Sequence, residues 1–301
     1  MKDLKEKITT LKAEKNAVIL AHYYVSPDVQ EIADYVGDSF YLAKIAKSSD
    51  AETIVFCGVE FMGESAKILS PEKTVLMPDA SADCPMAHMA SAESVLEMKK
   101  KYSDLAVVCY INSSAELKTV SDVCVTSANA LKIVNALPNE NIYFIPDKNL
   151  GSFVRKNSDK NILLNEGWCP IHNNITAESV KKLKDKHPCA KVLMHPECTE
   201  DVLSCADYIG STSGIIEYTE KSPEKEFIII TEIGVIYELQ KRNPNKKFYF
   251  PEPLPVCADM KKITAEKVYS CLRDNLNKVE IDDKTREKAL IPLNRMLELA
   301  R

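Results

Sequence analysis

A threefold internal repeat of about 85 residues restricts the fold of this chain more than any other feature. Three short apolar runs, AVILAHYY, LAVVCYIN and AKVLMHPE, are rich in β-branched residues, and polar sequence that favours a helix start follows each of them. They lead to His22, Tyr110 and His195, which are 88 and 85 positions apart. Each run therefore predicts the first buried parallel strand of one repeat.

The register of the repeat holds beyond these strands. Seventeen positions after each anchor residue stands a small hydroxyl residue that opens an apolar helical segment, and eighteen positions later the chain enters a second apolar run. Another apolar helix and a fourth short strand follow, and a cysteine stands just past that strand. The hydroxyl residues are Ser39, Ser127 and Thr212, the second runs contain Cys57, Ile145 and Ile230, and the matched cysteines are Cys84, Cys169 and Cys257.

Short strands that alternate with helices in this way predict an α/β fold with parallel strands and right-handed crossovers. We expect three homologous three-layer αβα domains, residues 1–98, 99–184 and 185–301, the last of which includes the C-terminal helices. Open α/β sheets bind ligands at the carboxyl ends of their strands. If the domains surround a pseudo-threefold axis with those ends inward, the active site lies at the centre.

The ten cysteines of the chain are spread over its whole length, which favours a reducing compartment over a disulfide framework. Burial as a small apolar residue can explain most of them, but not readily three at one position of a repeat. Two metal sites remain open. Three thiolates can hold three irons of a cubane cluster and leave the fourth iron free for substrate. Alternatively, zinc can be bound by three cysteines and His172, which follows Cys169 by three residues.

A second polar residue follows each strand-end residue by two positions, and strand alternation places both members of a pair on one face. Imidazole and carboxylate groups exchange protons, while phenol and amide groups donate hydrogen bonds, so the set suits acid–base chemistry on a small polar substrate. One histidine alone would more often make a structural hydrogen bond. Imidazole or phenol at all three anchor positions favours catalysis. The pairs are His22 with Tyr24, Tyr110 with Asn112 and His195 with Glu197.

The hydroxyl residues Ser39, Ser127 and Thr212 have two compatible interpretations. Such residues are the commonest helix N-caps, a role that needs no ligand. Three helix N-termini around a pocket would also bind carboxylates or a phosphate, so the predicted ligand is a small di- or trianion. The chain has no glycine-rich phosphate loop and only 8 glycines, which disfavours a nucleotide cofactor.

Charge and hydropathy exclude other classes of function. The net charge is −5, without long blocks of like charge, which argues against binding of nucleic acid or an anionic membrane surface. No apolar run approaches the roughly 18 residues that a membrane-spanning helix needs, and the charged start MKDLKEKITTLKAEKN does not resemble a signal peptide. We therefore expect a cytoplasmic protein.

Nine motifs resemble those of the quinolinate synthase family of NAD biosynthesis: AHYY, GDSF, PDASADC, YIN, TSANA, GWCPIH, MHPEC, GSTSG and CADMK, in that order over nearly the entire chain. The resemblance implies three α/β domains around a pseudo-threefold axis. It also implies condensation of iminoaspartate with dihydroxyacetone phosphate to quinolinate, with loss of phosphate and water. A separate oxidase or dehydrogenase could then supply the iminoaspartate.

For individual residues, the resemblance implies a [4Fe–4S] cluster held by Cys84, Cys169 and Cys257, with one iron open as a Lewis acid. Some members of the family carry a CxxCxxC run at the third ligand, whereas this chain has Cys257 alone, so a redox switch by the extra pair is not available. Lys221, in the charged segment YTEKSPEKE, has only weak support. Substrate contacts are implied for His22, Tyr24, Ser39, Tyr110, Asn112, Ser127, His172, His195, Glu197 and Thr212.

The chemistry of these residues suggests Glu197, aided by His195, as the base, with His22 nearby and Tyr24 and Tyr110 as donors to oxygens. The sequence does not assign individual proton transfers. Two other functions remain open: an iron–sulfur dehydratase of another hydroxy acid, which needs no phosphate site, and an iron–sulfur or zinc sensor, which needs an exposed partner surface.

Overall fold

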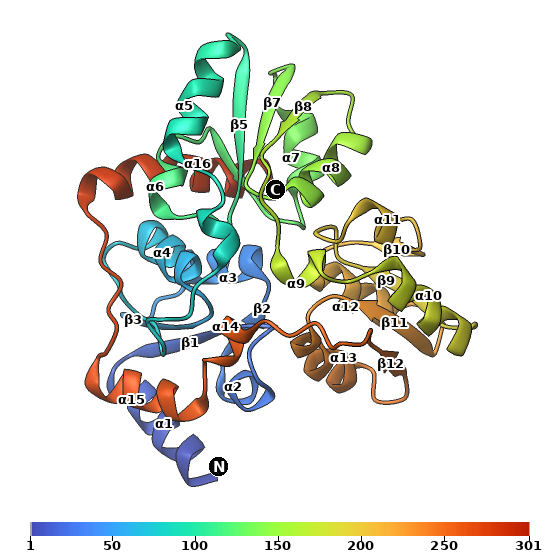
Figure 1. Ribbon diagram of the computed structural model, residues 1–301. Coiled ribbons are helices and arrows are strands. Elements are labelled where there is room, and N and C mark those ends of the chain that lie inside the picture. Colours follow the sequence, from blue (N-terminus) through green and yellow to red (C-terminus); the bar gives the residue numbers. More distant parts are fainter. Residues whose placement is uncertain (1, 301) are drawn as a thin grey trace.

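The computed structural model describes residues 2–300 and contains three parallel β-sheets that follow one another along the chain (Figure 1). In each sheet the first strand of the repeat lies between the second and the third, and the fourth strand lies beyond the third. Because every strand pair is parallel, the predicted α/β class is confirmed. The strands are β1 (Ala17–His22), β2 (Tyr35–Gly37), β3 (Thr53–Cys57) and β4 (Thr74–Leu76); β5 (Leu105–Tyr110), β6 (Val123–Val125), β7 (Asn141–Ile145) and β8 (Asn161–Leu164); and β9 (Lys191–Met194), β10 (Tyr208–Ile209), β11 (Glu226–Ile230) and β12 (Lys247–Tyr249).

Helices cover these sheets, as the alternating pattern predicts (Figure 1). The first sheet is accompanied by α1 (Lys2–Glu14), α2 (Pro27–Ile32), α3 (Ser39–Ser48) and α4 (Glu60–Leu69). The second is accompanied by α5 (Ala92–Lys101), α6 (Ala115–Lys118), α7 (Ala130–Ala136) and α8 (Lys148–Lys156). The third is accompanied by α10 (Ala177–Lys186), α11 (Glu200–Leu203), α12 (Thr212–Lys221), the 3₁₀ turn η2 (Ile233–Val235) and α13 (Ile236–Arg242).

The third sheet shows why both of its faces are covered. Val192 and Met194 of β9 pack into one apolar cluster, whereas Leu193 between them packs into another. Helices α10 and α11 contribute to the first cluster through Val180 and Val202, and α12 and α13 contribute to the second. Apolar side chains on both faces of a strand require helices on both sides, which is the predicted αβα layering.

An aspartate at the same register of each repeat fixes the start of the second strand. Asp34, Asp122 and Asp207 precede β2, β6 and β10 and accept a hydrogen bond from a backbone N–H of the neighbouring strand at 2.7–2.8 Å. They are 88 and 85 positions apart, so the repeat carries them, although the motifs above did not include them. Lysines pair with all three carboxylates.

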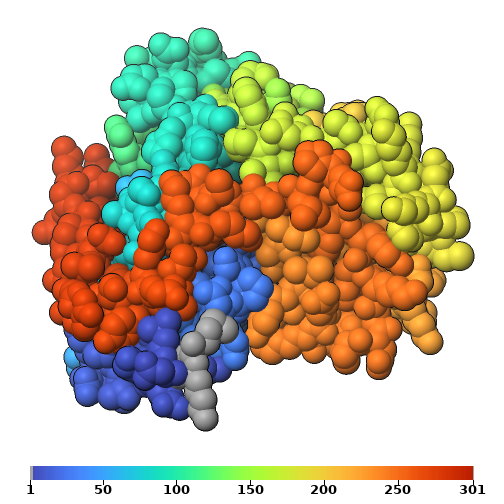
Figure 2. Space-filling model, turned by 60° about the horizontal axis from the view of Figure 1, so that its bottom comes forward, coloured from blue at the N-terminus to red at the C-terminus, as the bar shows by residue number. Residues whose placement is uncertain are grey.

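The C-terminal helices return to the first two repeats. Helix α14 (Ala258–Lys261) leads to α15 (Ala265–Asp274), which packs on α1, and to α16 (Asp283–Leu299), which packs on α4, α6 and β6. In the view of Figure 2, the orange and red C-terminal segments form a band across the face of the molecule that is shown, against the blue first repeat. The first and second sheets and these helices share one apolar core, while the third sheet has clusters of its own.

Each sheet lies within one of the expected ranges 1–98, 99–184 and 185–301, whose boundaries stay a prediction. No described helix combines the length and apolar character that crossing a membrane requires.

Candidate active site

One cavity at the carboxyl ends of the strands is lined by all thirteen residues that the sequence analysis selected as ligands or substrate contacts. β1 ends at His22, β5 ends at Tyr110, and His195 follows β9 directly. The other side chains reach the cavity from loops and helix starts that follow these strands, as expected for parallel sheets. The thirteen residues are His22, Tyr24, Ser39, Cys84, Tyr110, Asn112, Ser127, Cys169, His172, His195, Glu197, Thr212 and Cys257. Lys221 lies elsewhere, exposed at the end of α12 and paired with Glu217 at 3.2 Å.

Sequence reasoning missed several polar residues of the cavity wall. Asp83 and Glu232 line it beside two of the cysteines, and Asp38 and Thr126 line it beside Ser39 and Ser127. The repeat could have identified Glu232, because this acidic residue follows Ile230 by two positions and the acidic residue Asp147 follows the equivalent Ile145 by two positions.

None of the three matched hydroxyl residues is a helix N-cap. The N-caps of α3 and α12 are Asp38 and Ser211, whose side chains accept the backbone N–H of Tyr41 and Gly214. The cap interpretation is therefore wrong for Ser39 and Thr212, which are the first residues of their helices. It is also wrong for Ser127, because α7 begins after Asn129.

Hydroxyl groups instead join the repeats across the cavity. The Tyr24 hydroxyl lies 2.8 Å from the hydroxyls of both Thr212 and Thr231, and the Ser127 hydroxyl lies 3.1 Å from Nε2 of His195. These contacts link the first repeat to the third and the second to the third. The residues face one another rather than solvent.

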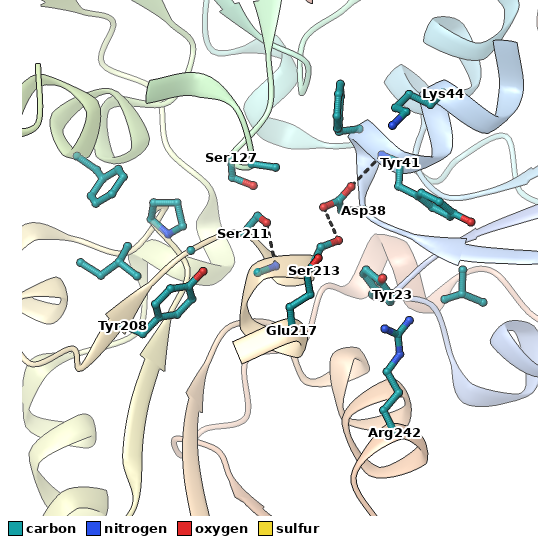
Figure 3. Close-up of a pocket in the computed structure, with 18 residues that line it drawn as sticks. Tyr23, Asp38, Tyr41, Lys44, Ser127, Tyr208, Ser211, Ser213, Glu217 and Arg242 are labelled. Carbon is teal, nitrogen blue, oxygen red and sulfur yellow. Dashed lines mark hydrogen bonds between the residues drawn. The ribbon is translucent and has the colours of Figure 1, made fainter. Parts of the chain in front are cut away.

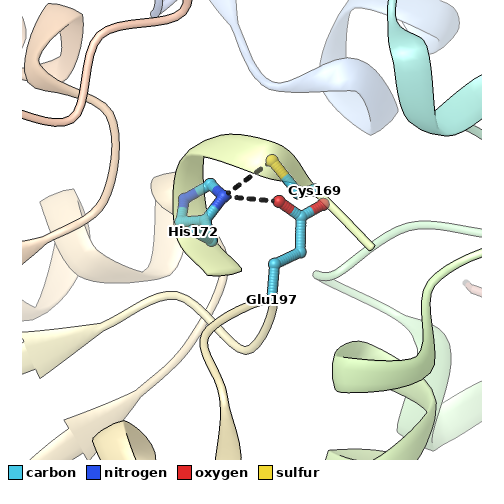
Figure 4. Close-up of side chains that lie close together, drawn as sticks. All are labelled: Cys169, His172 and Glu197. Carbon is cyan, nitrogen blue, oxygen red and sulfur yellow. Dashed lines mark hydrogen bonds and ion pairs between the residues drawn. The ribbon is translucent and has the colours of Figure 1, made fainter. Parts of the chain in front are cut away.

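Glu197 is the centre of the acid–base group (Figure 4). Its Oε2 lies 2.7 Å from Nδ1 of His172 and 3.6 Å from Nδ1 of His195. The two imidazoles stack with ring centroids 4.6 Å apart, and Nε2 of His172 lies 2.9 Å from the Thr231 hydroxyl. Glu197 and both histidines are almost fully buried.

Burial and neighbouring groups set the charges. Burial raises the pKa of Glu197, but His195, His172 and the Tyr110 hydroxyl more than offset this and hold it well below its usual range. Burial lowers the pKa of His22 and His195 to about 3, so both are neutral at neutral pH. Burial and the negative charge of Glu197 raise the pKa of Tyr110. The site thus holds an ionised carboxylate beside two neutral imidazoles and a protonated phenol.

The three matched cysteines share one local structure. Each immediately precedes a short helical turn: η1 (Pro85–His88) after Cys84, α9 (Pro170–Asn173) after Cys169 and α14 after Cys257. Burial raises the pKa of all three thiols, whereas backbone N–H groups of the following turn act in the opposite direction. Without a cation these thiols stay protonated, and a bound metal supplies the charge that thiolates need in such a place.

The spacing of the thiols bears on which metal group fits. Among the described residues, ligand atoms within 4.8 Å of one another occur in two sets, Cys169 with His172 and Glu197, and Glu60 with Asp83 and His88. The three cysteines do not form such a set. Tetrahedral zinc, with Zn–S bonds of about 2.3 Å, would bring its sulfurs to roughly 3.8 Å. The donor set therefore fits a larger metal group better than one zinc ion.

A second cavity of about 680 Å³ adjoins the first and shares Asp38 and Ser127 with it (Figure 3). It carries two cationic side chains, Lys44 and Arg242. The Ser213 hydroxyl donates to Asp38 at 2.6 Å, as one dashed line in Figure 3 shows. This contact joins α12 to the start of α3 beside both cavities.

Three parallel sheets with a buried carboxylate, imidazoles, phenols and thiols at their strand ends define an α/β enzyme. The family model described as Quinolinate synthetase A protein matches residues 6–298, so the chain belongs to this family. The predicted family and the prediction of an enzyme are confirmed.

Three curated relatives are named quinolinate synthase. The chain is 55% identical over 298 residues to that of Fusobacterium nucleatum, with 99% of both chains covered. It is 53% identical over 300 residues to that of Clostridioides difficile, again with 99% of both covered. It is 52% identical over 297 residues to that of Caldicellulosiruptor bescii, with 98% of both covered.

Proposed function

We propose that this chain is a quinolinate synthase that condenses iminoaspartate with dihydroxyacetone phosphate and releases phosphate and water. The observation that carries the proposal is the single cavity in which Cys84, Cys169 and Cys257 meet the Glu197 acid–base group. Family membership over residues 6–298 supports the same reaction. Iminoaspartate would come from an enzyme that oxidises aspartate.

A [4Fe–4S] cluster fits the donor set, with Cys84, Cys169 and Cys257 as its protein ligands. Each thiol comes from a different repeat, and among the described residues the three sulfurs do not form a set within 4.8 Å of one another. When bound, the cluster supplies a Lewis acid at the iron that has no cysteine. We further propose that the three sheets surround a pseudo-threefold axis through this site.

Glu197 is the proposed proton acceptor. Its carboxylate is buried and lies 2.7 Å from Nδ1 of His172, which orients it. Its lowered pKa keeps it ionised at neutral pH. His195 and His22 are neutral and can accept or donate a hydrogen bond, and Tyr24 and Tyr110 keep their protons and donate to substrate oxygens. These groups can bind a substrate and take one proton from carbon.

Anion binding is assigned to the hydroxyls of Ser39, Ser127 and Thr212, whereas Asn112 Oδ1 is assigned to accept a hydrogen bond from an N–H or O–H group of the substrate. Ser39 and Thr212 open ten-residue helices, whose first N–H groups carry partial positive charge. The buried Oδ1 of Asn112 has no hydrogen-bond partner among the described residues, and buried polar atoms rarely stay unpaired. A polar substrate in the cavity would satisfy it.

The experiment is anaerobic purification, iron and sulfide analysis, and an assay with iminoaspartate and dihydroxyacetone phosphate. We expect about four irons and four sulfides per chain, the content of one [4Fe–4S] cluster, and quinolinate with equimolar phosphate. Bound zinc without sulfide would contradict the cluster. A full cluster without quinolinate, but with dehydration of a hydroxy acid, would favour the dehydratase alternative.

A further inference from the structure

A buried carboxylate holds the backbone of one proposed ligand cysteine. Glu232 follows β11 and is fully buried. Its Oε1 accepts the backbone N–H of Cys257 at 3.0 Å, and its Oε2 accepts the N–H of Gly234 at 2.6 Å. Lys261, at the end of the helix that Cys257 precedes, pairs with Oε1 at 2.9 Å. Cys257 is thus fixed from both sides by one carboxylate and its cation.

The second repeat has a carboxyl group at the equivalent position. Asp147 follows the end of β7 by two residues, as Glu232 follows the end of β11, and it is also fully buried. Its Oδ1 accepts the N–H groups of Asn149 and Leu150. Its Oδ2 has no hydrogen-bond partner among the described residues. Asp147 forms a β-bridge with Gly167, two residues before Cys169, so the carboxyl occupies the matched register position without a hydrogen bond to the Cys169 amide.

The first repeat reaches the arrangement of the third by another route. The equivalent position is Val59, which has no acceptor in its side chain. In this repeat the residue before the cysteine supplies the carboxyl. Asp83 Oδ1 accepts the backbone N–H of Cys84 at 2.6 Å, and Asp83 Oδ2 lies 2.7 Å from Nε2 of His88. A carboxyl that accepts the cysteine amide thus occurs in the first and third repeats, although different residues supply it.

We propose that Asp83 and Glu232 are positioning residues that hold the backbone amides of Cys84 and Cys257, and so orient these two thiols toward one bound iron–sulfur group. The inference rests on the proposed function. A carboxyl that holds the amide of the cysteine fixes the start of the helical turn that follows it, and with it the direction in which the thiol leaves the backbone.

The Cys257 contact also reaches the substrate side of the cavity. Lys261 donates to the backbone carbonyl of Tyr24 as well as pairing with Glu232. The amide of Cys257 and the backbone of Tyr24 are therefore linked through two side chains. This link couples the position of a ligand in the third repeat to that of a substrate contact in the first.

The test compares variants that keep or lose the acceptor oxygen. Glu232→Gln and Asp83→Asn retain it, whereas Glu232→Val and Asp83→Val replace it with the residue found at position 59. The readouts are iron and sulfide content after anaerobic reconstitution, and the rate at which a ferrous chelator removes iron. Loss of a group that orients a metal ligand costs about 10- to 100-fold in metal affinity. We expect iron loss to accelerate by at least about tenfold in the Val variants and to stay within about threefold of wild type in the amide variants.

Asp207→Val is the matched control, because Asp207 also accepts a backbone N–H, that of Val192, away from the cysteines. It should lower the melting temperature and leave iron retention unchanged. Wild-type iron retention in Glu232→Val and Asp83→Val, with lowered melting temperatures, would overturn the proposal. If the Val variants do not fold, Asp83→Ala tests the same contact at a half-exposed site. Its unchanged iron retention would equally overturn it.

Cys257→Ala distinguishes the positioning role of Glu232 from the proposed ligand role of Cys257. Loss of iron in Cys257→Ala with normal retention in Glu232→Val would reject the positioning role alone. Full iron content in Cys257→Ala would reject the proposed ligand set itself.

Discussion

The hydroxyl groups of Tyr24 and Thr212 lie 2.8 Å apart and join the first repeat to the third at the cavity wall. Tyr24 follows β1, and Thr212 is the first residue of α12, whose N-cap is Ser211. Because Ser211 caps the helix, the Thr212 hydroxyl is not used as a cap and contacts Tyr24 at the cavity wall instead.

Thr212→Ala, Ser39→Ala and Ser127→Ala should therefore weaken quinolinate binding. Loss of one hydrogen bond to a charged group corresponds to about 1.4 kcal/mol, or roughly tenfold in affinity. We expect this effect in at least two of the three variants, measured by titration with quinolinate. The control is Ser91→Ala, because Ser91 caps α5 by accepting the N–H of Ser94. That change should cost about 1 kcal/mol of stability and leave affinity unchanged. Unchanged affinity in all three site variants would show that the hydroxyls do not bind the ligand.

Cys84→Ala, Cys169→Ala and Cys257→Ala should each abolish quinolinate formation and strongly reduce bound iron, because two thiolates cannot hold the cluster. The controls are Cys57, Cys109 and Cys271, which are equally free but buried in the core. Their replacement by Ala should leave iron content near wild type. Iron and sulfide analysis decides the matter, and normal iron in a ligand variant would refute the assignment.

Glu197→Gln should keep the cluster and lower turnover by roughly 10² or more, the usual scale for loss of a general base. The amide retains the shape of the side chain and a hydrogen bond to His172, but it cannot take a proton. Iron content and kcat are measured on the same preparation. Near-normal turnover with full iron would mean that Glu197 is only structural.

The ion pair between Asp79, after β4, and Lys267 of α15 should make stability depend on pH in acid. Burial opposes the charge of Asp79, but hydrogen bonds from Lys267 and Ser81 lower its pKa to about 2. Because an unfolded aspartate has a pKa of about 3.9, the pair stabilises the fold above that pH and loses this effect as the pH falls toward 2. The difference in unfolding free energy between wild type and Asp79→Asn should thus shrink between about pH 5 and pH 2. Urea unfolding at several pH values measures it, and a constant difference would contradict the pairing.

Gly234→Ala should destabilise the protein and disturb the Glu232 contact. A Cβ at this position would lie 2.7 Å from Cα of Tyr24 and 2.8 Å from both the Tyr23 carbonyl oxygen and Glu232 Oε2. Backbone atoms cannot yield as a side-chain end can, so we expect a loss of about 1–3 kcal/mol. Gly214→Ala is the control, because its closest neighbour is the movable hydroxyl of Tyr208 at 2.8 Å. Equal melting temperatures for the two variants would contradict this reasoning.

The parts of the molecule that depend on local pattern could be predicted from sequence. Buried parallel strands have a strong apolar signal, and the threefold register alone predicts His22, Tyr110 and His195 at equivalent strand ends. Convergence of the predicted residues follows from that register, because parallel strands present their carboxyl ends on one side.

Features that depend on which distant groups meet could not be predicted in this way. The carboxyl of Glu232 meets the amide of Cys257 from 25 residues away, and nothing in either segment specifies that contact. The cap role was misplaced by one residue because Asp38 and Ser39, like Ser211 and Thr212, are adjacent polar residues that both suit a helix start. Packing of α15 and α16 against the first two repeats likewise depends on tertiary contacts alone.

The position of α16 also sets an order of events during synthesis. Its residues Ala289, Leu293 and Met296 belong to the same apolar core as the first and second sheets, yet the ribosome makes them after all twelve strands. Until then the surfaces of α4, α6 and β6 that α16 covers remain open to water or to other chains. The core of the first two repeats, although made first, is therefore among the last parts to be completed. One cluster of the third sheet is built from residues 175–249 alone, while the other also includes Tyr23 of the first repeat.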